Sequence, residues 1–146
     1  MNGERQEVFV VTIDCGQSLD EMIKVGGYDE ISEAVRLVTF PWKRKGIREV
    51  ELTLVQFAYP LAPGEAKKLM AGRGYRPAYV EELLALGREQ PDLQRRNPIV
   101  ALGSGRIIQG RRRTVCLGGS ASSRSLQLVT IYRRWSIYYR FAFVRR

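Results

Sequence analysis

The chain has 146 residues, of which 45% are hydrophobic and 27% charged, and this matches one folded domain better than a disordered or repeat protein. It contains no histidine, which argues against catalytic triads and zinc hydrolase sites, since both commonly need an imidazole. The net charge of +9 is uneven, because residues 93–146 hold 12 arginines and no acid, whereas residues 1–92 hold 12 basic and 15 acidic residues.

The chain begins with the pattern of a strand followed by a helix. Residues 7–13 are rich in β-branched and aromatic side chains, which favours a strand. Ser18 and Glu21 have the spacing of a capping box, so a helix is expected to begin at Ser18. Two glycines predict that it ends near Gly26 and Gly27.

A second helix, a loop and a second strand are expected next. Residues 29–38 carry apolar side chains at roughly helical spacing, and residues 39–45 contain a proline and three basic residues, which indicates a loop. Residues 49–57 alternate with period two, as in a strand with one buried face.

Two further helices are predicted before the sequence changes character. Residues 64–71 form one, ended by glycines that tolerate positive φ. Residues 77–88 have an apolar leucine stripe and form the other. Glu81 and Glu82 fall in its first turns, where capping and solvation account for them.

The C-terminal third predicts short strands. Strand-like segments at 99–102, 106–109, 114–117, 126–131 and 137–144 are separated by glycines at 103, 105, 110, 118 and 119 and by serine-rich residues 120–125. The order of strands and helices predicts an α+β fold rather than alternating βαβ units. Ordinary turns explain these glycines better than a phosphate loop, since no lysine motif or following helix accompanies them.

The cysteines and the apolar runs bear on the redox state and the location of the protein. Cys15 and Cys116 are far apart and lack metal-ligand spacing, so buried thiols are favoured over a disulfide. No signal peptide or apolar run long enough to span a bilayer is visible, which predicts a cytoplasmic location by default. We expect no catalytic residues, no metal and no cofactor, although an enzyme of another type remains a third alternative.

Several long pieces of the chain resemble variable proteins of diversity-generating retroelements of the archaeal and candidate-phylum type. The similar pieces are SLDEMI at 18–23, ELTLVQF at 51–57, RGYRPAYVEELLALG at 73–87, PDLQRRNPIVALGS at 91–104 and WSIYYRFAFVRR at 135–146. Tyr79 departs from the pattern, which has a threonine helix cap at this position. The Gln90-Pro91-Asp92 triplet also occurs in calcium-binding lectins, but it follows a helix and has no Trp-Asn-Asp partner here.

This resemblance implies a single C-type-lectin-like domain over residues 1–146, with two or more helices packed on small antiparallel sheets. It also implies mutagenic retrohoming, in which a reverse transcriptase copies a template with errors at adenines into the 3′ end of the gene. The variable region would cover about residues 114–146, and the protein would bind an unknown protein or other macromolecular ligand.

The physical reading of the C-terminal stretch divides it into exposed contact positions and buried anchors. Tyrosine, arginine and serine are frequent in binding surfaces, and alternation separates them from bulky apolar positions. The expected ligand-binding residues follow no packing pattern, and they are Ser122, Ser125, Gln127, Val129, Thr130, Ile131, Tyr132, Arg133, Ser136, Ile137 and Tyr138. The expected scaffold anchors are Leu126, Leu128, Trp135, Arg140, Phe141 and Val144.

The alternative function is binding of nucleic acid. Arginines are interleaved with aromatic residues in the C-terminal third, a combination that single-stranded nucleic-acid grooves use. The surface arginines expected there include Arg111–Arg113, Arg124 and Arg140. No named nucleic-acid motif accompanies them, and strands that hide aromatics and expose arginines would give the same pattern.

Overall fold

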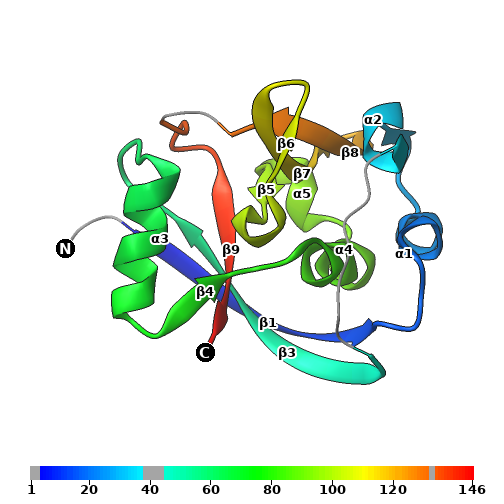
Figure 1. The fold of residues 1–146 in the computed structure, drawn as a ribbon, viewed down its shortest axis with the longest axis horizontal. Coiled ribbons are helices and arrows are strands. Elements are labelled where there is room, and N and C mark those ends of the chain that lie inside the picture. Colours follow the sequence, from blue (N-terminus) through cyan, green and yellow to red (C-terminus); the bar gives the residue numbers. More distant parts are fainter. Residues whose placement is uncertain (1–3, 38–44, 132–133) are drawn as a thin grey trace.

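The computed structural model of the protein describes residues 4–37, 45–131 and 134–146 (Figure 1). Within them the strands are β1 (Arg5–Asp14), β2 (Glu30–Ile31), β3 (Ile47–Gln56), β4 (Tyr75–Pro77), β5 (Ile99–Val100), β6 (Arg106–Ile108), β7 (Arg111–Ser120), β8 (Ser123–Thr130) and β9 (Arg140–Arg145). The helices are α1 (Leu19–Gly26), α2 (Glu33–Leu37), α3 (Pro63–Gly72), α4 (Val80–Glu89), α5 (Leu93–Arg96) and the 3-10 turn η1 (Leu102–Ser104). The fold is therefore α+β and strand-rich, as expected. The loop expected at 39–45 lies outside the described residues except for its last position.

The strands of the described residues join into one mixed sheet. Its order is β1-β3-β9-β5-β7-β8-β2, with β6 paired to β7 and with β4 and β5 sharing one edge of β9. Most pairs are antiparallel, but β5–β9 and β2–β8 are parallel. The expectation of small antiparallel sheets is wrong, because the C-terminal strand β9 returns between β3 and β5 and joins the two halves (Figure 1).

Both faces of the central strands are buried. On one face, Leu52 and Leu54 of β3 and Ala142 of β9 pack in a cluster with residues of α1 and α4. On the opposite face, Val55 and Phe141 pack with residues of α3. Because side chains alternate across a strand, neighbouring residues of β3 and β9 belong to different clusters. Helices therefore cover the sheet from two sides.

Local signals account for α1 as predicted. The Ser18 hydroxyl accepts a hydrogen bond from the Glu21 N–H, and the Glu21 carboxylate accepts one from the Ser18 N–H, both at 3.2 Å. Gly27 ends the helix with a φ of 65°, a left-handed conformation that costs glycine little.

The helix expected over 29–38 is shorter in the structure. Residues Glu30–Ile31 form β2 instead, and only Glu33–Leu37 are helical. The Asp29 N–H donates to the Arg124 carbonyl at 2.8 Å, and the Ser32 N–H donates to the Leu126 carbonyl at 2.9 Å. Pairing with β8 satisfies these amides in extended geometry, so tertiary contacts override the local helical spacing.

Helix α4 begins at Val80 rather than Pro77, because Pro77 pairs with Phe143 in the sheet. The Val80 N–H donates to the Ser104 hydroxyl at 2.9 Å, so a distant serine caps the helix where Tyr79 lacks a suitable side chain. The Glu82 carboxylate accepts from the Tyr79 N–H at 2.8 Å.

The expectation that Glu81 and Glu82 are solvated is wrong. Both are buried, at 2% and 0% exposure. Arg76 forms a bidentate pair with Glu82 at 2.8 and 2.9 Å, and Arg48 lies 3.2 Å from the same carboxylate. Burial by itself would raise the pKa of Glu82, but the Arg76 hydrogen bonds, the Tyr79 N–H and the two guanidinium charges hold this pKa below its usual value.

In the C-terminal third, β7 continues through the glycines that were expected to break it. Gly118 pairs with Ser125 and Gly119 with Arg124, so the turn falls at residues 121–122. A side chain on Gly119 would collide with the Ser123 carbonyl, and its φ is 140°. The glycine permits close approach of two strands rather than a turn. The last strand also starts later than expected, at Arg140.

Arg124 is buried, at 4% exposure, although it was expected among the surface arginines. It uses all five guanidinium N–H groups. Their acceptors are the carbonyls of Gly26 (2.7 Å), Gly27 (3.1 Å), Gly87 (2.7 Å) and Pro91 (2.9 Å) and the side-chain oxygen of Gln94 (3.2 Å). The guanidinium also lies 4.8 Å from the centre of the Tyr28 ring. It therefore connects β8 to the C-terminal ends of α1 and α4.

Both cysteines are free and buried, in agreement with the expectation of thiols. Burial raises the pKa of the Cys116 thiol to about 12. It therefore stays protonated near neutral pH and acts as a small apolar side chain.

Replacing Arg124 with methionine is expected to lower the free energy of unfolding by about 3 kcal/mol or more, because each buried carbonyl left without a donor costs about 1–3 kcal/mol. Urea denaturation measures this change. The control is Arg106→Met in β6, an exposed arginine whose replacement should change stability by less than about 0.5 kcal/mol. Equal losses in the two variants would contradict the role assigned to Arg124.

Candidate binding surface

The expected ligand-binding residues on β8 and in the turn before it differ in exposure. Ser122 and Gln127 are exposed, whereas Ser125 is buried at 5% exposure. The Ser125 hydroxyl accepts from the Gln127 side chain at 2.8 Å, and Gln94 donates to the Ser125 carbonyl at 3.0 Å. Ser125 therefore holds the Gln127 side chain by a hydrogen bond and does not itself face solvent.

The next residues of this segment are half-buried. Val129 and Ile131 pack against the second core cluster, and Thr130 is also partly covered. The expectation that these residues follow no packing pattern is therefore wrong for Val129 and Ile131. Tyr132 and Arg133 lie outside the described residues.

Ser136, Ile137 and Tyr138 form an exposed turn before β9. Ile137 is 40% exposed and Tyr138 67%. The Ile137 carbonyl accepts from the Gln56 side chain, and the Tyr138 carbonyl accepts from the Asn97 side chain, both at 3.0 Å. These bonds hold the main chain of the turn through side chains of β3 and of the segment before β5. The side chains of Ile137 and Tyr138 take no part in them.

Ser136 is the exception within the turn. Its hydroxyl accepts from the Tyr138 N–H at 3.2 Å, and its carbonyl accepts from the Tyr139 N–H at 3.1 Å. Its side chain therefore contributes to the shape of the turn.

The expected anchors lie mostly inside the protein. Leu128 is half-buried, and the remaining anchors are buried: Leu126, Trp135, Arg140, Phe141 and Val144. Trp135 packs edge-on against Tyr139 and Phe141, with ring centres 4.6 and 5.9 Å apart. The main-chain N–H of Trp135 donates to the Leu61 carbonyl at 3.1 Å. Arg140, an expected anchor that the nucleic-acid alternative had placed at the surface, is buried, and its guanidinium lies 3.1 Å from the Glu7 carboxylate.

A groove on the α3 side adjoins this turn. It has a volume of about 390 Å³, and its lining residues are Tyr59, Leu61, Glu65, Lys68 and Leu69. Leu61 belongs both to the groove and to the bridge with Trp135, so the groove and the turn share one junction. The residue pattern did not predict this groove. The sequence feature that could have indicated it is an aromatic residue next to a proline, Tyr59-Pro60.

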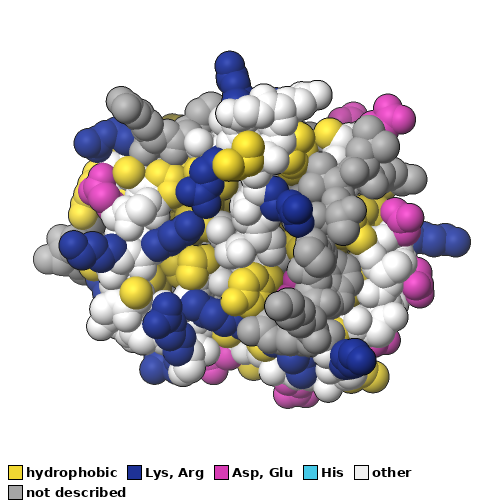
Figure 2. All heavy atoms as spheres, viewed as in Figure 1, with side chains coloured by type: hydrophobic (Ala, Val, Ile, Leu, Met, Phe, Trp, Pro, Cys, Tyr) yellow, Lys and Arg dark blue, Asp and Glu magenta, His cyan; other side chains and the backbone are white. Residues whose placement is uncertain are grey.

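The β6–β7 hairpin carries a group of arginines without acidic partners among the described residues. They are Arg106, Arg111, Arg112 and Arg113. Figure 2 shows Lys and Arg side chains over the middle and left of this face, with Asp and Glu mainly toward its margins. Lys67 of α3 lies close enough to be affected: partial burial and the Arg112 charge lower the pKa of its ammonium group. The hairpin and α3 therefore form a positively charged region.

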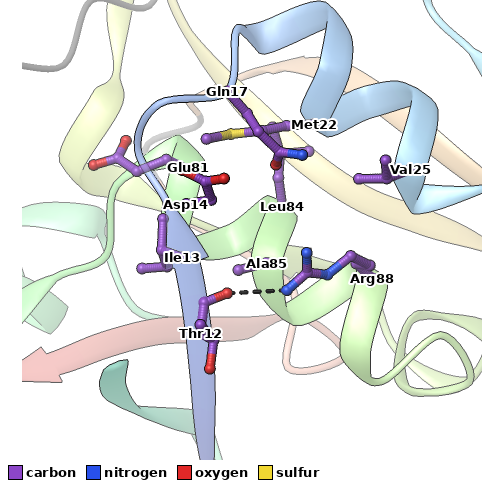
Figure 3. A pocket seen from close by; sticks show the side chains of 10 residues that line it. All are labelled: Thr12, Ile13, Asp14, Gln17, Met22, Val25, Glu81, Leu84, Ala85 and Arg88. Carbon is purple, nitrogen blue, oxygen red and sulfur yellow. Dashed lines mark hydrogen bonds between the residues drawn. The ribbon is translucent and has the colours of Figure 1, made fainter. Parts of the chain in front are cut away.

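A second hollow lies between β1, α1 and α4 (Figure 3). Ten residues line it: Thr12, Ile13, Asp14, Gln17, Met22, Val25, Glu81, Leu84, Ala85 and Arg88. Arg88 donates to the Thr12 carbonyl at 3.0 Å across its opening. Its volume of about 10 Å³ corresponds to about one water molecule, so it does not hold a substrate.

Among the described residues, no group of three or more Cys, Asp or Glu side chains is arranged to hold a metal ion. None of the helices in the described ranges has the length and apolar character needed to cross a bilayer.

Comparison with known proteins identifies no relative of the chain. No family model, no curated protein and no solved structure matches it.

The turn and its anchor should respond differently to truncation. Tyr138→Ala is expected to change the free energy of unfolding by less than about 0.5 kcal/mol, since the side chain is exposed. Trp135→Ala should lower it by about 3–5 kcal/mol, since it empties a large buried site. Thermal and urea denaturation of both variants measure the contrast. A comparable loss in Tyr138→Ala would show that the exposed turn is part of the scaffold.

Proposed function

We propose that this protein is the ligand-binding variable protein of a diversity-generating retroelement, with a C-type-lectin-like scaffold. The observation that carries the proposal is the turn at Ser136, Ile137 and Tyr138. Its backbone is held by Gln56 and Asn97, while two of its side chains point to solvent without a structural bond. Such a turn keeps its shape when those side chains are replaced.

The surroundings of the turn support replacement without loss of the fold. Trp135 on one side and Phe141 on the other are buried in the second core cluster. On β8, Gln127 is exposed next to the fully buried Leu126. A rigid backbone with exchangeable side chains binds with a small entropic cost, because little has to be ordered on binding.

The chemistry of this surface suits a macromolecular ligand. Ile137, Tyr138, Tyr59 and Leu69 are exposed large apolar or aromatic side chains, and two of them line the adjoining groove. Tyrosine contributes a large amphipathic contact area with few rotatable bonds, and aromatic residues are enriched in protein interfaces. We propose a protein ligand, with Gln127, Ile137 and Tyr138 as exchangeable contacts.

The gene's neighbourhood tests the proposal. Sequencing the flanking DNA is expected to reveal a near-copy of the segment that encodes about residues 114–146, differing at adenines and close to a reverse transcriptase gene. Differences between isolates should concentrate at codons 127, 137 and 138 and spare codons 126, 135 and 141. Equal variation at Trp135 and Tyr138, or the absence of any template copy, would contradict the proposal.

The arginine hairpin favours a second candidate function, the binding of nucleic acid. Arg106, Arg111, Arg112 and Arg113 lie on two paired strands, and the described residues provide no acid to neutralise them. Clustered cations of this kind bind phosphate backbones and release condensed counterions. The named motifs of nucleic-acid-binding proteins are absent from the sequence.

Salt dependence tests this second candidate. If it holds, affinity for arbitrary single-stranded DNA falls steeply with salt, and Arg112→Glu weakens binding and reduces the slope of log K against log salt by about 1. The control is Lys24→Glu on the exposed side of α1, a reversal of the same charge outside the hairpin. Fluorescence anisotropy with a labelled oligonucleotide measures both. Binding that is absent near physiological salt, or equally weakened by the two variants, would argue against this function.

A further inference from the structure

Strand β1 is a long edge strand of the sheet. It stands at one end of the strand order and pairs with β3 alone, over ten residues. Natural proteins usually keep edge strands short or cover them, because unpaired backbone groups can pair with another chain. The other end of the order is the two-residue strand β2. Of the two end strands in the described part of the chain, β1 is therefore the one that presents a long edge.

One end of β1 is closed by side chains of α4. The Thr12 N–H donates to the Glu89 carboxylate at 2.8 Å, and the Thr12 carbonyl accepts from Arg88 at 3.0 Å. These bonds show that the backbone groups of Thr12 point away from β3. Because backbone direction alternates along a strand, the groups of Val10, Val8 and Gln6 point outward as well.

At those three positions the outward backbone groups have no partner among the described residues. The side chains there are also exposed: Val8 is 54% exposed and Val10 62%. Since Phe9, Val11 and Ile13 belong to the first core cluster or pack against it, Val8 and Val10 lie on the other face of the strand. Two exposed β-branched residues thus accompany an open backbone edge.

We propose that two copies of this chain associate by antiparallel pairing of their β1 strands, with the two-fold axis at Val8. The open positions Gln6, Val8 and Val10 are symmetric about Val8. In this register Val8 faces its counterpart, and Gln6 faces Val10 of the second copy. Each pair exchanges two backbone hydrogen bonds.

The same register is favourable for the side chains. It brings the exposed Val8 side chains of the two copies together on one face, which removes apolar surface from water. Arg5 lies opposite Val11 and Glu7 opposite Phe9 of the other copy, so no like charges face each other. Pairing ends before Thr12, whose outward groups already bond to Arg88 and Glu89. A second copy therefore provides hydrogen-bond partners for all the open backbone groups of Gln6, Val8 and Val10.

Sedimentation equilibrium from about 10 µM to about 1 mM protein is the test, since pairing over five residues gives a modest affinity. The intact chain is expected to shift toward twice its monomer mass as concentration rises. Val8→Pro removes the two central hydrogen bonds and leaves pairing with β3 intact, because the Val8 N–H points away from β3. It should weaken association about 30-fold.

A second variant does not depend on proline. Val8→Lys keeps the backbone donors but places two ammonium groups opposite each other at the axis, and it should also weaken the dimer. The matched control is Val25→Lys on α1, where the valine is 48% exposed, and it should associate like the intact chain. Circular dichroism verifies that each variant is folded. An intact chain that stays monomeric throughout, or folded Val8 variants that associate like the intact chain, would overturn the proposal.

Discussion

The guanidinium of Arg124 holds the arrangement on which the other features depend. Its donors bond to the last carbonyls of α1, to the last turn of α4 and to Gln94 of α5, so three helices are tied to one residue of β8. Helix C-termini carry partial negative charge, which stabilises a buried cation without a carboxylate. Tyr28 covers the group, and a side chain on Gly26 would collide with the Tyr28 ring, as one on Gly87 would with the Tyr28 hydroxyl. The helices can therefore approach only because both positions are glycine.

The position of Arg124 links this network to the candidate binding surface. Leu126 and Gln127 follow it on β8, one facing the first core cluster and the other exposed to solvent. On the opposite face of the sheet, Trp135 and Phe141 fix the two ends of the 136–138 turn. The surface is held by side chains that are not part of it, and this separation of roles is what a surface with exchangeable residues requires.

Charge is also divided between structural and exposed roles. Glu82, Glu7 and Glu4 are each paired with an arginine in the structure. The acids of the first two thirds are thus partly used to hold arginines of β4, β9 and the segment after α3. The β6–β7 hairpin lacks such partners within the described residues, so its four arginines carry positive charge that no acid compensates.

Elements whose signals are local could be predicted from the residue pattern. The capping box at Ser18, the alternation in β3 and the leucine stripe of α4 depend on neighbours within a turn or a strand, so α1, β3, α4 and the α+β class could be predicted. The same alternation placed Leu126 inside and Gln127 outside. These predictions needed no knowledge of which segments meet.

Features that depend on distant partners could be recognised in the folded chain but not in the residue pattern. Arg124 is buried because it reaches the Gly26 carbonyl 98 positions away, and Ser104 caps α4 from 24 positions away. Ser125, Val129 and Ile131 are covered because the second core cluster and Gln94 lie against them. The last strand, β9, lies in the middle of the sheet because it pairs with β3 and β5, which are distant from it in the sequence. Residue types and periodicity do not specify these long-range contacts, because many partners of equal polarity and size would be compatible with the same local pattern.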